Sequence, residues 1–304
     1  MRRRAPLAML MVGTVVANAC AVRGGTANDA VNQTTAQEHR GGSTAACFSV
    51  SSLSAADRRD ADRVLLEFAD REGLYTLAGG IKPISSDVRD LTVRIAPTID
   101  SAALATLDQQ RRIAAALSCG EIGAFVQVFT ATQRRRDSSE VRNTSMVIFH
   151  RAAVRRTIEA HASFFATLGV TVSTDPREVI LAVENAPRSP RWRGYGYLFG
   201  YPDDAVDFFV RAGEEGDASG KLVPRDFRRI ETWYKYPAGS GDAPTLSSFV
   251  FAVPKGAAQS DQEAALRAAA APVYARYARE RAGAIQPDSS GAMALFRRWM
   301  SERR

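Results

Sequence analysis

Two stretches of the sequence combine residues that could bind or transform a small molecule. In the first, Gly79 and Gly80 permit positive φ angles and close backbone approach, and Lys82 follows as one of only four lysines. Backbone N–H groups exposed beside an ammonium group would bind an anion or a carboxylate. The same residues also suit a tight turn with Lys82 in solvent, and this simpler interpretation is favoured.

The second stretch, residues 194–210, brings phenols and acids together. Tyr195, Tyr197 and Tyr201 alternate with glycines, and Asp204 follows shortly afterwards. If Lys82, these tyrosines and the Asp204 carboxylate lined one cleft, they could act as the acid, base and anion-binding groups of an enzyme. That hypothesis requires the groups to converge around a single pocket.

Metal and cofactor signatures are weak. Asp203, Asp204 and Asp207 match the DDxxD pattern with which prenyl-transferring synthases hold magnesium, but those enzymes are all-helical and carry a second acidic motif. Acids at the start of a helix explain the same residues. His150 and His161 lie eleven positions apart on a predicted helix, whereas helical metal ligands are usually one turn apart. No metal and no cofactor is therefore expected.

Several nucleotide-binding and hydrolase motifs are incomplete or missing. The glycines at 194 and 196 are followed by Gly200, which is one position too late for a dinucleotide-binding turn. Residues 216–221 lack the spacing and the hydroxyl of a phosphate-binding loop, and neither Gly-x-Ser-x-Gly nor Ser-x-x-Lys occurs. These absences favour a non-catalytic binding or interaction domain over an enzyme.

The elements that would position these residues can be predicted around residues 194–210. Glycine and aromatic residues with near-alternate spacing predict a buried strand over 194–201. Pro202 and two aspartates then predict a helix from 203 to about 212, ended by Gly213. A strand that feeds directly into an amphipathic helix is typical of an α/β core.

Capping residues and hydrophobic periodicity predict the remaining elements. Helices are expected from the Ser54 cap to Gly73, over 101–118, over 150–168, over 176–184 with Thr174 or Asp175 as cap, from the Ser260 cap to Gly283 with a kink at Pro272, and over 292–303. Extended segments are expected at 74–77, 91–95, 122–130 paired with 141–149, and 227–236 paired with 246–253 across the loop 237–245. The sum is one α+β or mixed α/β domain with a central sheet flanked by helices.

The N-terminal segment predicts export. Three arginines at 2–4 precede an apolar run, 5–17, that is too short to span a bilayer. Residues 16–20, Val-Ala-Asn-Ala-Cys, resemble the bacterial lipobox, although the Ala and Asn at 17 and 18 depart from its usual residues. The resemblance implies a lipoprotein signal peptide over 1–19 and acylation of Cys20 with fatty acids such as palmitate. The alternative is a soluble periplasmic or secreted protein.

Residues 20–46 predict a disordered tether between that anchor and a globular domain over 47–304. The segment is rich in Gly, Thr, Asn, Gln and Ser and has almost no large apolar residue, so it cannot offset its ordering entropy by burial. Once Cys20 carries lipid, Cys47 and Cys119 remain as an even pair. They are expected either to form a disulfide in an oxidising compartment or to remain two buried thiols.

Charge argues against a nucleic-acid partner. The formal net charge is +7, and removal of the three leading arginines with the signal would lower it to +4. All but four of the 40 basic residues are arginine, and they are interspersed with acids. An electrostatic footprint for nucleic acid should instead be concentrated in a patch or stripe.

Residues 74–85 and 194–210 together resemble segments of uncharacterised exported bacterial proteins, a resemblance that implies no activity. The sequence thus predicts a lipid-anchored protein of the cell envelope, whose globular domain binds an unknown protein or small-molecule partner and whose contact with the membrane is the anchor. The alternative is an envelope enzyme with a pocket lined by Lys82 and the strand from Tyr195 to Tyr201.

Overall fold

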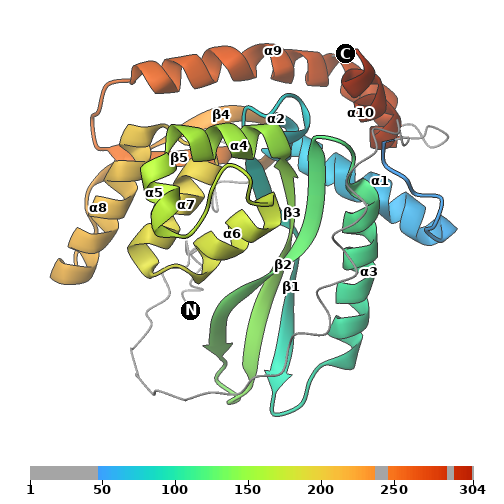
Figure 1. The fold of residues 1–304 in the computed structure, drawn as a ribbon, viewed down its shortest axis with the longest axis horizontal. Helices are drawn as coiled ribbons and strands as arrows, with labels where there is room; N and C mark the ends of the chain where they lie inside the picture. The colour runs from blue at the N-terminus through green and yellow to red at the C-terminus, as the bar shows by residue number, and fades with distance from the viewer. Residues whose placement is uncertain (1–46, 237–245, 286–290, 303–304) are drawn as a thin grey trace, which may run out of the picture.

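The computed structural model describes residues 47–236, 246–285 and 291–302, within which the chain forms ten helices and five strands (Figure 1). The predicted signal peptide, Cys20, the tether and the loop 237–245 lie outside these residues. The helices are α1 (Ala55–Asp70), α2 (Gly73–Leu77), α3 (Ser101–Leu117), α4 (Arg151–Ala160), α5 (Ala162–Thr167), α6 (Pro176–Asn185), α7 (Arg188–Leu198), α8 (Asp203–Ser219), α9 (Asp261–Ala284) and α10 (Gly291–Ser301). The strands are β1 (Ile84–Ala96), β2 (Ile122–Arg134), β3 (Glu140–His150), β4 (Arg225–Tyr236) and β5 (Leu246–Pro254).

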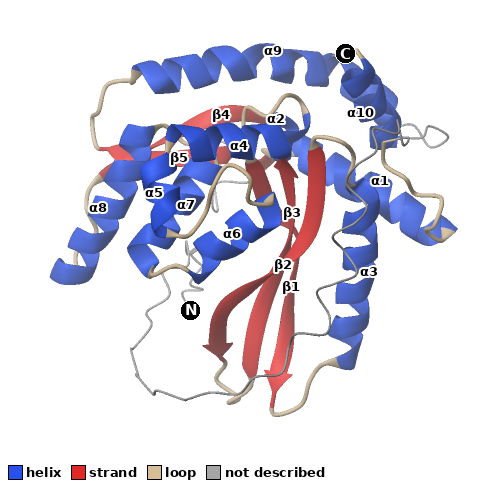
Figure 2. Cartoon of the chain, in the orientation of Figure 1, coloured by secondary structure: helices blue, strands red, loops and turns tan. Residues whose placement is uncertain are grey.

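The strands form two antiparallel sheets (Figure 2). In the larger sheet β3 lies between β1 and β2, and in the smaller sheet β4 pairs with β5. Both predicted hairpins are confirmed, with Ala124 opposite Ile148 in one and Phe227 opposite Ala252 in the other. Helices on both sides of the larger sheet complete a mixed α+β domain, as the sequence predicts.

Successive residues of the central strand β3 point to two different cores, because side chains alternate across a sheet. Met146 and Ile148 belong to the core shared with α1 and α3, which pack on one face. Val147 and Phe149 belong to the core shared with α4, α6 and α7 on the other face. The smaller sheet lies between α8, which contacts β5, and α9, which contacts β4.

Predicted helix caps are confirmed at three N-termini. The backbone N–H of Asp57 donates to Ser54 Oγ at 3.0 Å, and that of Glu263 donates to Ser260 Oγ at 3.2 Å. Of the two candidates for the cap of α6, Asp175 is the cap, because its Oδ1 atom accepts from the backbone N–H of Arg177 at 2.9 Å. Each cap satisfies a donor that the first helical turn would otherwise leave unpaired.

The prediction of a strand over 194–201 is wrong, because this segment forms the C-terminal part of α7 and the turn after it. Its glycines lie where α7 packs closely against two neighbouring helices. A Cβ atom on Gly194 would lie 2.8 Å from Val183 of α6, and one on Gly196 would lie 2.7 Å from Val206 of α8. The same alternation of glycine that suits close strand packing here lets α7 approach two helices.

Three other predictions about helices and strands are also wrong. Residues 74–77 form the short helix α2 rather than an extended piece, and the helix predicted over 150–168 is interrupted at His161, which has a φ of −121°. The helix that begins at Asp203 continues through Gly213 to Ser219, and Gly220 ends it with a φ of +67°. Gly213 is retained inside α8 because the ring of Trp192 occupies the space of its missing side chain.

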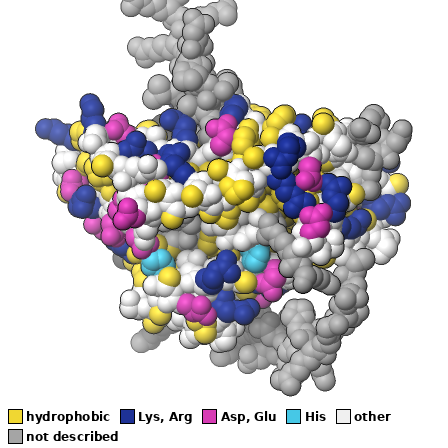
Figure 3. Space-filling model, turned by 90° about the horizontal axis from the view of Figure 1, so that it is seen from above, with side chains coloured by type: hydrophobic (Ala, Val, Ile, Leu, Met, Phe, Trp, Pro, Cys, Tyr) yellow, Lys and Arg dark blue, Asp and Glu magenta, His cyan; other side chains and the backbone are white. Residues whose placement is uncertain are grey.

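Acidic and basic side chains lie interspersed on the face of the molecule that Figure 3 shows, which includes α9. Along α9 itself, Arg267 pairs with Glu263 and Arg276 with Glu280. In these two ion pairs, each arginine is neutralised by a glutamate of the same helix. Within the described ranges, the chain has no helix that is long and apolar enough to cross a membrane.

Candidate functional site

Lys82, the centre of the predicted anion site, is buried inside the protein. Its Nζ atom donates to the carbonyl oxygen of Phe199 at 3.2 Å and lies 3.4 Å from Glu72 Oε1. The ammonium group also lies 4.4 Å from the centre of the Phe199 ring and 4.7 Å from that of Phe249, which are cation–π distances. Internal groups therefore satisfy this charge, and its side chain has no exposed surface with which to meet an anion.

The double glycine does adopt positive φ angles, 129° at Gly79 and 63° at Gly80, as predicted. However, the N–H groups of Ile81 and Lys82 both donate inward to the carbonyl oxygen of Tyr75, at 3.0 and 3.3 Å. A Cβ atom on Gly80 would lie 2.9 Å from the ring of His150. Geometry and close approach to α4 thus explain the glycines, and the N–H groups of Ile81 and Lys82 are not available to an anion.

The tyrosines and Asp204 are directed to different places. Tyr197 stacks on His161 with ring centres 3.7 Å apart, and Asp204 is exposed and accepts from Ser260 Oγ at 3.4 Å. Tyr195 and Tyr201 line one cavity, and Tyr197 and Tyr201 line a second, smaller one with Gly80, but neither lining includes Lys82 or Asp204. The expected enzyme pocket, with Lys82, the tyrosines and Asp204 around one space, is therefore not formed.

The acidic run and the histidines also have separate structural partners. Asp203 accepts from Gln262 Nε2 at 3.0 Å and lies 3.4 Å from His161 Nε2, whereas Asp207 pairs with Arg193. His150 caps α4, where its Nδ1 accepts from the backbone N–H of Ala153. In the part of the chain that the structure describes, no group of three His, Cys, Asp or Glu side chains is placed to hold a metal ion.

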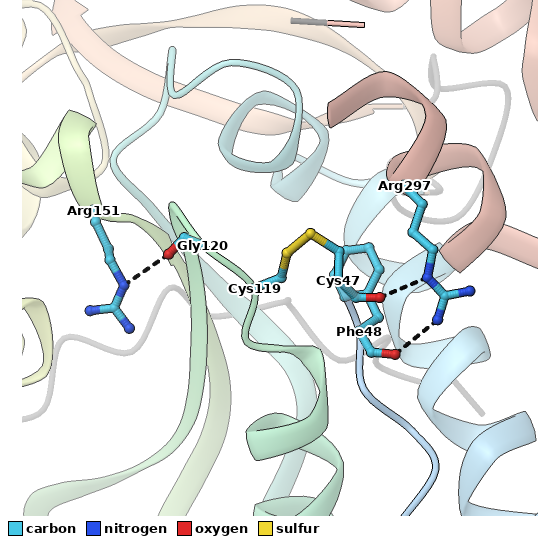
Figure 4. Close-up of a disulfide and its surroundings, with 6 residues drawn as sticks. All are labelled: Cys47, Phe48, Cys119, Gly120, Arg151 and Arg297. Atoms are coloured by element: carbon cyan, nitrogen blue, oxygen red, sulfur yellow. Dashed lines mark hydrogen bonds between the residues drawn. A yellow bond between two sulfur atoms is a disulfide. The ribbon is translucent and has the colours of Figure 1, made fainter. Parts of the chain in front are cut away.

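The two remaining cysteines form a disulfide, which decides between the alternatives left open by the sequence (Figure 4). Cys47 and Cys119 have Cα atoms 4.8 Å apart, and the bond joins the start of the domain to the end of α3. Arg297 of α10 donates to the carbonyl oxygens of Cys47 and Phe48 at 2.7 and 2.8 Å. These bonds tie the first described residues to the last helix, so this region has a structural role.

The main candidate site is a cavity of about 430 Å³ between the two sheets, bounded by α7 and α8. Small-molecule sites typically have volumes of about 300 to 1,000 Å³ and mostly apolar walls with a few polar groups. Half of the residues that line the cavity are aromatic, and the lining includes no Lys, Arg, His, Asp or Glu. It consists of Ile84, Ser86, Gln127, Phe129, Trp192, Tyr195, Gly196, Phe199, Tyr201, Ala205, Val206, Phe209, Phe227, Val250, Phe251 and Ala252.

Small residues and sheet alternation create this space. Ser86 of β1 and Gln127 and Phe129 of β2 lie on the sheet face on which α6 and α7 pack, and these three residues line the cavity. Gly196 lets α7 and α8 approach closely, and Ala205 presents only a methyl group from α8. At the rim, Phe227 is 43% exposed and Trp192 is half-buried, which makes an aromatic entrance.

A chain of hydrogen bonds runs behind one wall of the cavity. Gln127 Nε2 donates to the Tyr195 hydroxyl at 2.6 Å, and this hydroxyl donates to Glu184 Oε2 at 2.8 Å. The other carboxylate oxygen of Glu184 accepts from the backbone N–H and the hydroxyl of Thr130, both at 2.9 Å. Burial, reinforced by the neighbouring Glu184 charge, raises the pKa of the Tyr195 phenol above its ordinary value. The phenol is therefore a neutral donor at physiological pH.

The sequence contained a partial signal for this site. Residues 194–210 were expected to matter, and Tyr195 and Tyr201 do reach the cavity. Gln127 was missed, although it is a polar residue inside a strand predicted to be buried, a pattern that requires a hydrogen-bonding partner. Glu184 and Trp192 were missed because their roles depend on helix packing, which has no local signature.

No protein-family model, curated protein or solved structure matches this chain. Function is therefore inferred from the cavity and from the hydrogen-bond chain behind one of its walls.

Proposed function

We propose that this chain is an exported binding protein that takes up an apolar small molecule in the cavity between its two sheets. The observation that carries the proposal is the composition of the cavity wall, which is largely aromatic and aliphatic and has only neutral polar groups. Protein interiors are ordinarily packed as densely as organic crystals, so a space of about 430 Å³ is a departure that ligand binding explains.

The wall argues for binding rather than catalysis. An enzyme that works through a covalent intermediate needs a nucleophile and a base within hydrogen-bonding reach of each other, and no such pair lines the cavity. Burial raises the pKa of the Tyr195 phenol, and its proton is engaged by Glu184. The enzyme alternative, which placed Lys82 in a pocket with the tyrosines, is not carried forward.

Uptake of the fluorescent amine N-phenyl-1-naphthylamine tests the proposal. This probe is neutral and apolar, and its emission rises on transfer from water to an apolar site. The wild-type domain should show saturable enhancement, whereas Ser86→Phe, which places a ring in the cavity from the half-buried sheet position, should weaken binding at least tenfold. Thr92→Phe is the matched control, because Thr92 is exposed on the same strand.

Two outcomes would contradict cavity binding. One is an absence of saturable enhancement with the wild-type domain, and the other is an equal loss of affinity in Ser86→Phe and Thr92→Phe. Far-ultraviolet circular dichroism and thermal melting of both variants separate loss of the site from loss of the fold. Trp192 supplies a further readout, because energy transfer from tryptophan to the bound probe should fall in Trp192→Phe.

The location that we propose for this protein, outside the cytosol, is based on its sequence. The basic and apolar leader, the lipobox-like residues before Cys20 and the polar segment up to residue 46 support a lipid-anchored domain outside the cytosol. The disulfide between Cys47 and Cys119 is compatible with an oxidising compartment.

Metabolic labelling with radioactive palmitate tests this location. The wild-type protein should carry label and sediment with membranes, and Cys20→Ser should lose both properties. Label that persists in Cys20→Ser, or a wild-type protein that keeps its N-terminal arginines inside the cell, would contradict the anchor without affecting the cavity.

A further inference from the structure

The hydrogen-bond chain beside the cavity has a fixed direction. Glu184 is 4% exposed, and its carboxylate accepts from Thr130 through one oxygen and from Tyr195 through the other. Both carboxylate oxygens act as acceptors here, and the hydroxyl proton of Tyr195 is directed to Glu184. The Tyr195 oxygen then accepts, and Gln127 must turn its Nε2 atom towards it, as observed at 2.6 Å.

This direction leaves the Oε1 atom of Gln127 as a hydrogen-bond acceptor on a residue that lines the cavity. Gln127 lines the cavity and is only 2% exposed. Within the described residues, no group donates a hydrogen bond to its Oε1 atom. A buried carbonyl oxygen is stabilised when a donor reaches it, and the open space beside Gln127 is where a ligand would bring one.

The electrostatics of this wall favour a neutral ligand with a donor group. The Oε1 atom of Gln127 carries a partial negative charge. The amide of Gln127 is also connected to the Glu184 carboxylate by hydrogen bonds through the Tyr195 hydroxyl. No cationic side chain lines the cavity to attract an anion. A carboxylate, phosphate or sulfate placed here would lose its hydration without gaining a counter-charge, which costs more than burial of a neutral group.

We propose that the ligand of this cavity is an uncharged, largely apolar molecule carrying one hydroxyl or N–H group, which donates a hydrogen bond to Oε1 of Gln127. This proposal rests on the binding function proposed above and narrows its chemical class to lipophilic alcohols, phenols and amides. The aromatic walls hold the apolar part, and the single acceptor fixes its orientation. Ser86, a half-buried hydroxyl on the same sheet face, offers a second polar contact that can donate or accept.

Displacement of N-phenyl-1-naphthylamine by three molecules of equal chain length tests this class. The probes are 1-decanol, which can donate, its methyl ether, which cannot, and decanoate at pH 8, which is anionic. The wild-type domain should bind decanol about fivefold more tightly than the ether, the value of one net hydrogen bond, and decanoate should bind most weakly. Hydrophobicity alone gives the opposite order for the first two, because the ether has the larger apolar surface.

The variant Gln127→Leu isolates the acceptor. It should reduce the difference between decanol and the ether to less than twofold while the affinity for the ether itself changes little. The control Gln133→Leu makes the same change on the same strand at a residue that does not line the cavity, and the preference for decanol should persist.

Three results would overturn the assignment of the ligand class: equal wild-type affinities for decanol and ether, tighter binding of decanoate, or a decanol preference that survives in Gln127→Leu. Each of these leaves the binding function intact if the fluorescent amine still binds and Ser86→Phe still blocks it. Failure of the amine to bind the wild-type domain overturns both proposals. If Gln127→Leu does not fold, the comparison of the three probes on the wild-type domain still decides.

Discussion

The two faces of the three-stranded sheet are packed in different ways. On the face towards α1 and α3, large side chains such as Phe68 and Ile113 are buried to 1% exposure or less, and the disulfide closes the edge of this core. On the opposite face, helices cover Val147 and Phe149 but leave a cavity beside Gln127. The same sheet therefore combines a filled core with an open one.

The comparison indicates how stability and binding are divided in this fold. Side chains of the filled face have their surroundings completed by the protein, so their removal should reduce stability and leave the cavity unchanged. Side chains at the cavity border open space, so their removal should reduce affinity more than stability. Variants on each face can break or sharpen this division.

Removal of the disulfide should produce the largest effect. The bond between Cys47 and Cys119 closes a loop of 72 residues, for which the chain-entropy model gives a stabilisation of about 4 kcal/mol. The double variant Cys47→Ala and Cys119→Ala should therefore have a free energy of unfolding lower by about that amount, measured by urea denaturation. Its affinity for N-phenyl-1-naphthylamine, measured where the protein remains folded, should change less than twofold.

The wild-type protein treated with a reductant provides the matched control, since it breaks the same bond without substitution. A stability loss below about 1 kcal/mol in both would show that the bond contributes little to this core. A loss of probe affinity in folded protein would show that the two faces are coupled, and the division drawn above would fail.

Local chemistry made much of this fold predictable. Ser54, Asp175 and Ser260 were identified as caps from their own side chains and the residues that follow, and the structure places each as expected. The hairpin of β2 and β3 was predicted from two apolar strands around a polar turn. These features depend on residues that are close in sequence, so their signals are complete within a short window.

The errors arise where distant residues decide. Lys82 was expected in solvent beside a glycine turn, but Glu72, Phe199 and Phe249 surround it, and two of these are more than 100 positions away. Residues 194–201 were predicted as a strand because glycine alternation has the same appearance in a closely packed strand and in a helix that crosses two others. The contacts that distinguish these cases are tertiary.

The candidate site shows the same limit. Tyr195 was identified for its phenol, yet its role depends on Glu184 and Gln127, which lie on a different helix and on a strand. Hydrophobic periodicity shows that a residue faces a core, but it does not show whether that core is filled. The cavity was therefore beyond prediction from the sequence even where its strands were placed correctly.

Phe209→Ala should have the smallest effect on stability and the clearest effect on binding. Phe209 is half-buried on α8, lines the cavity and contacts Trp192 edge-on with ring centres 5.6 Å apart. Because one side of the ring faces open space, and because alanine is the better helix former, the free energy of unfolding should fall by only about 1 kcal/mol. Affinity for the fluorescent amine should fall about tenfold as an aromatic wall is lost.

The same substitution on the filled face is the matched control for Phe209→Ala. Phe68 of α1 is 1% exposed, so Phe68→Ala should lower the free energy of unfolding by about 3 kcal/mol or more. Its probe affinity should stay within twofold of the wild-type value at a temperature where it remains folded. Equal stability losses for the two variants, measured by urea denaturation, would contradict the distinction between the faces, because a ring beside an open cavity has fewer protein contacts to lose than a ring inside a filled core.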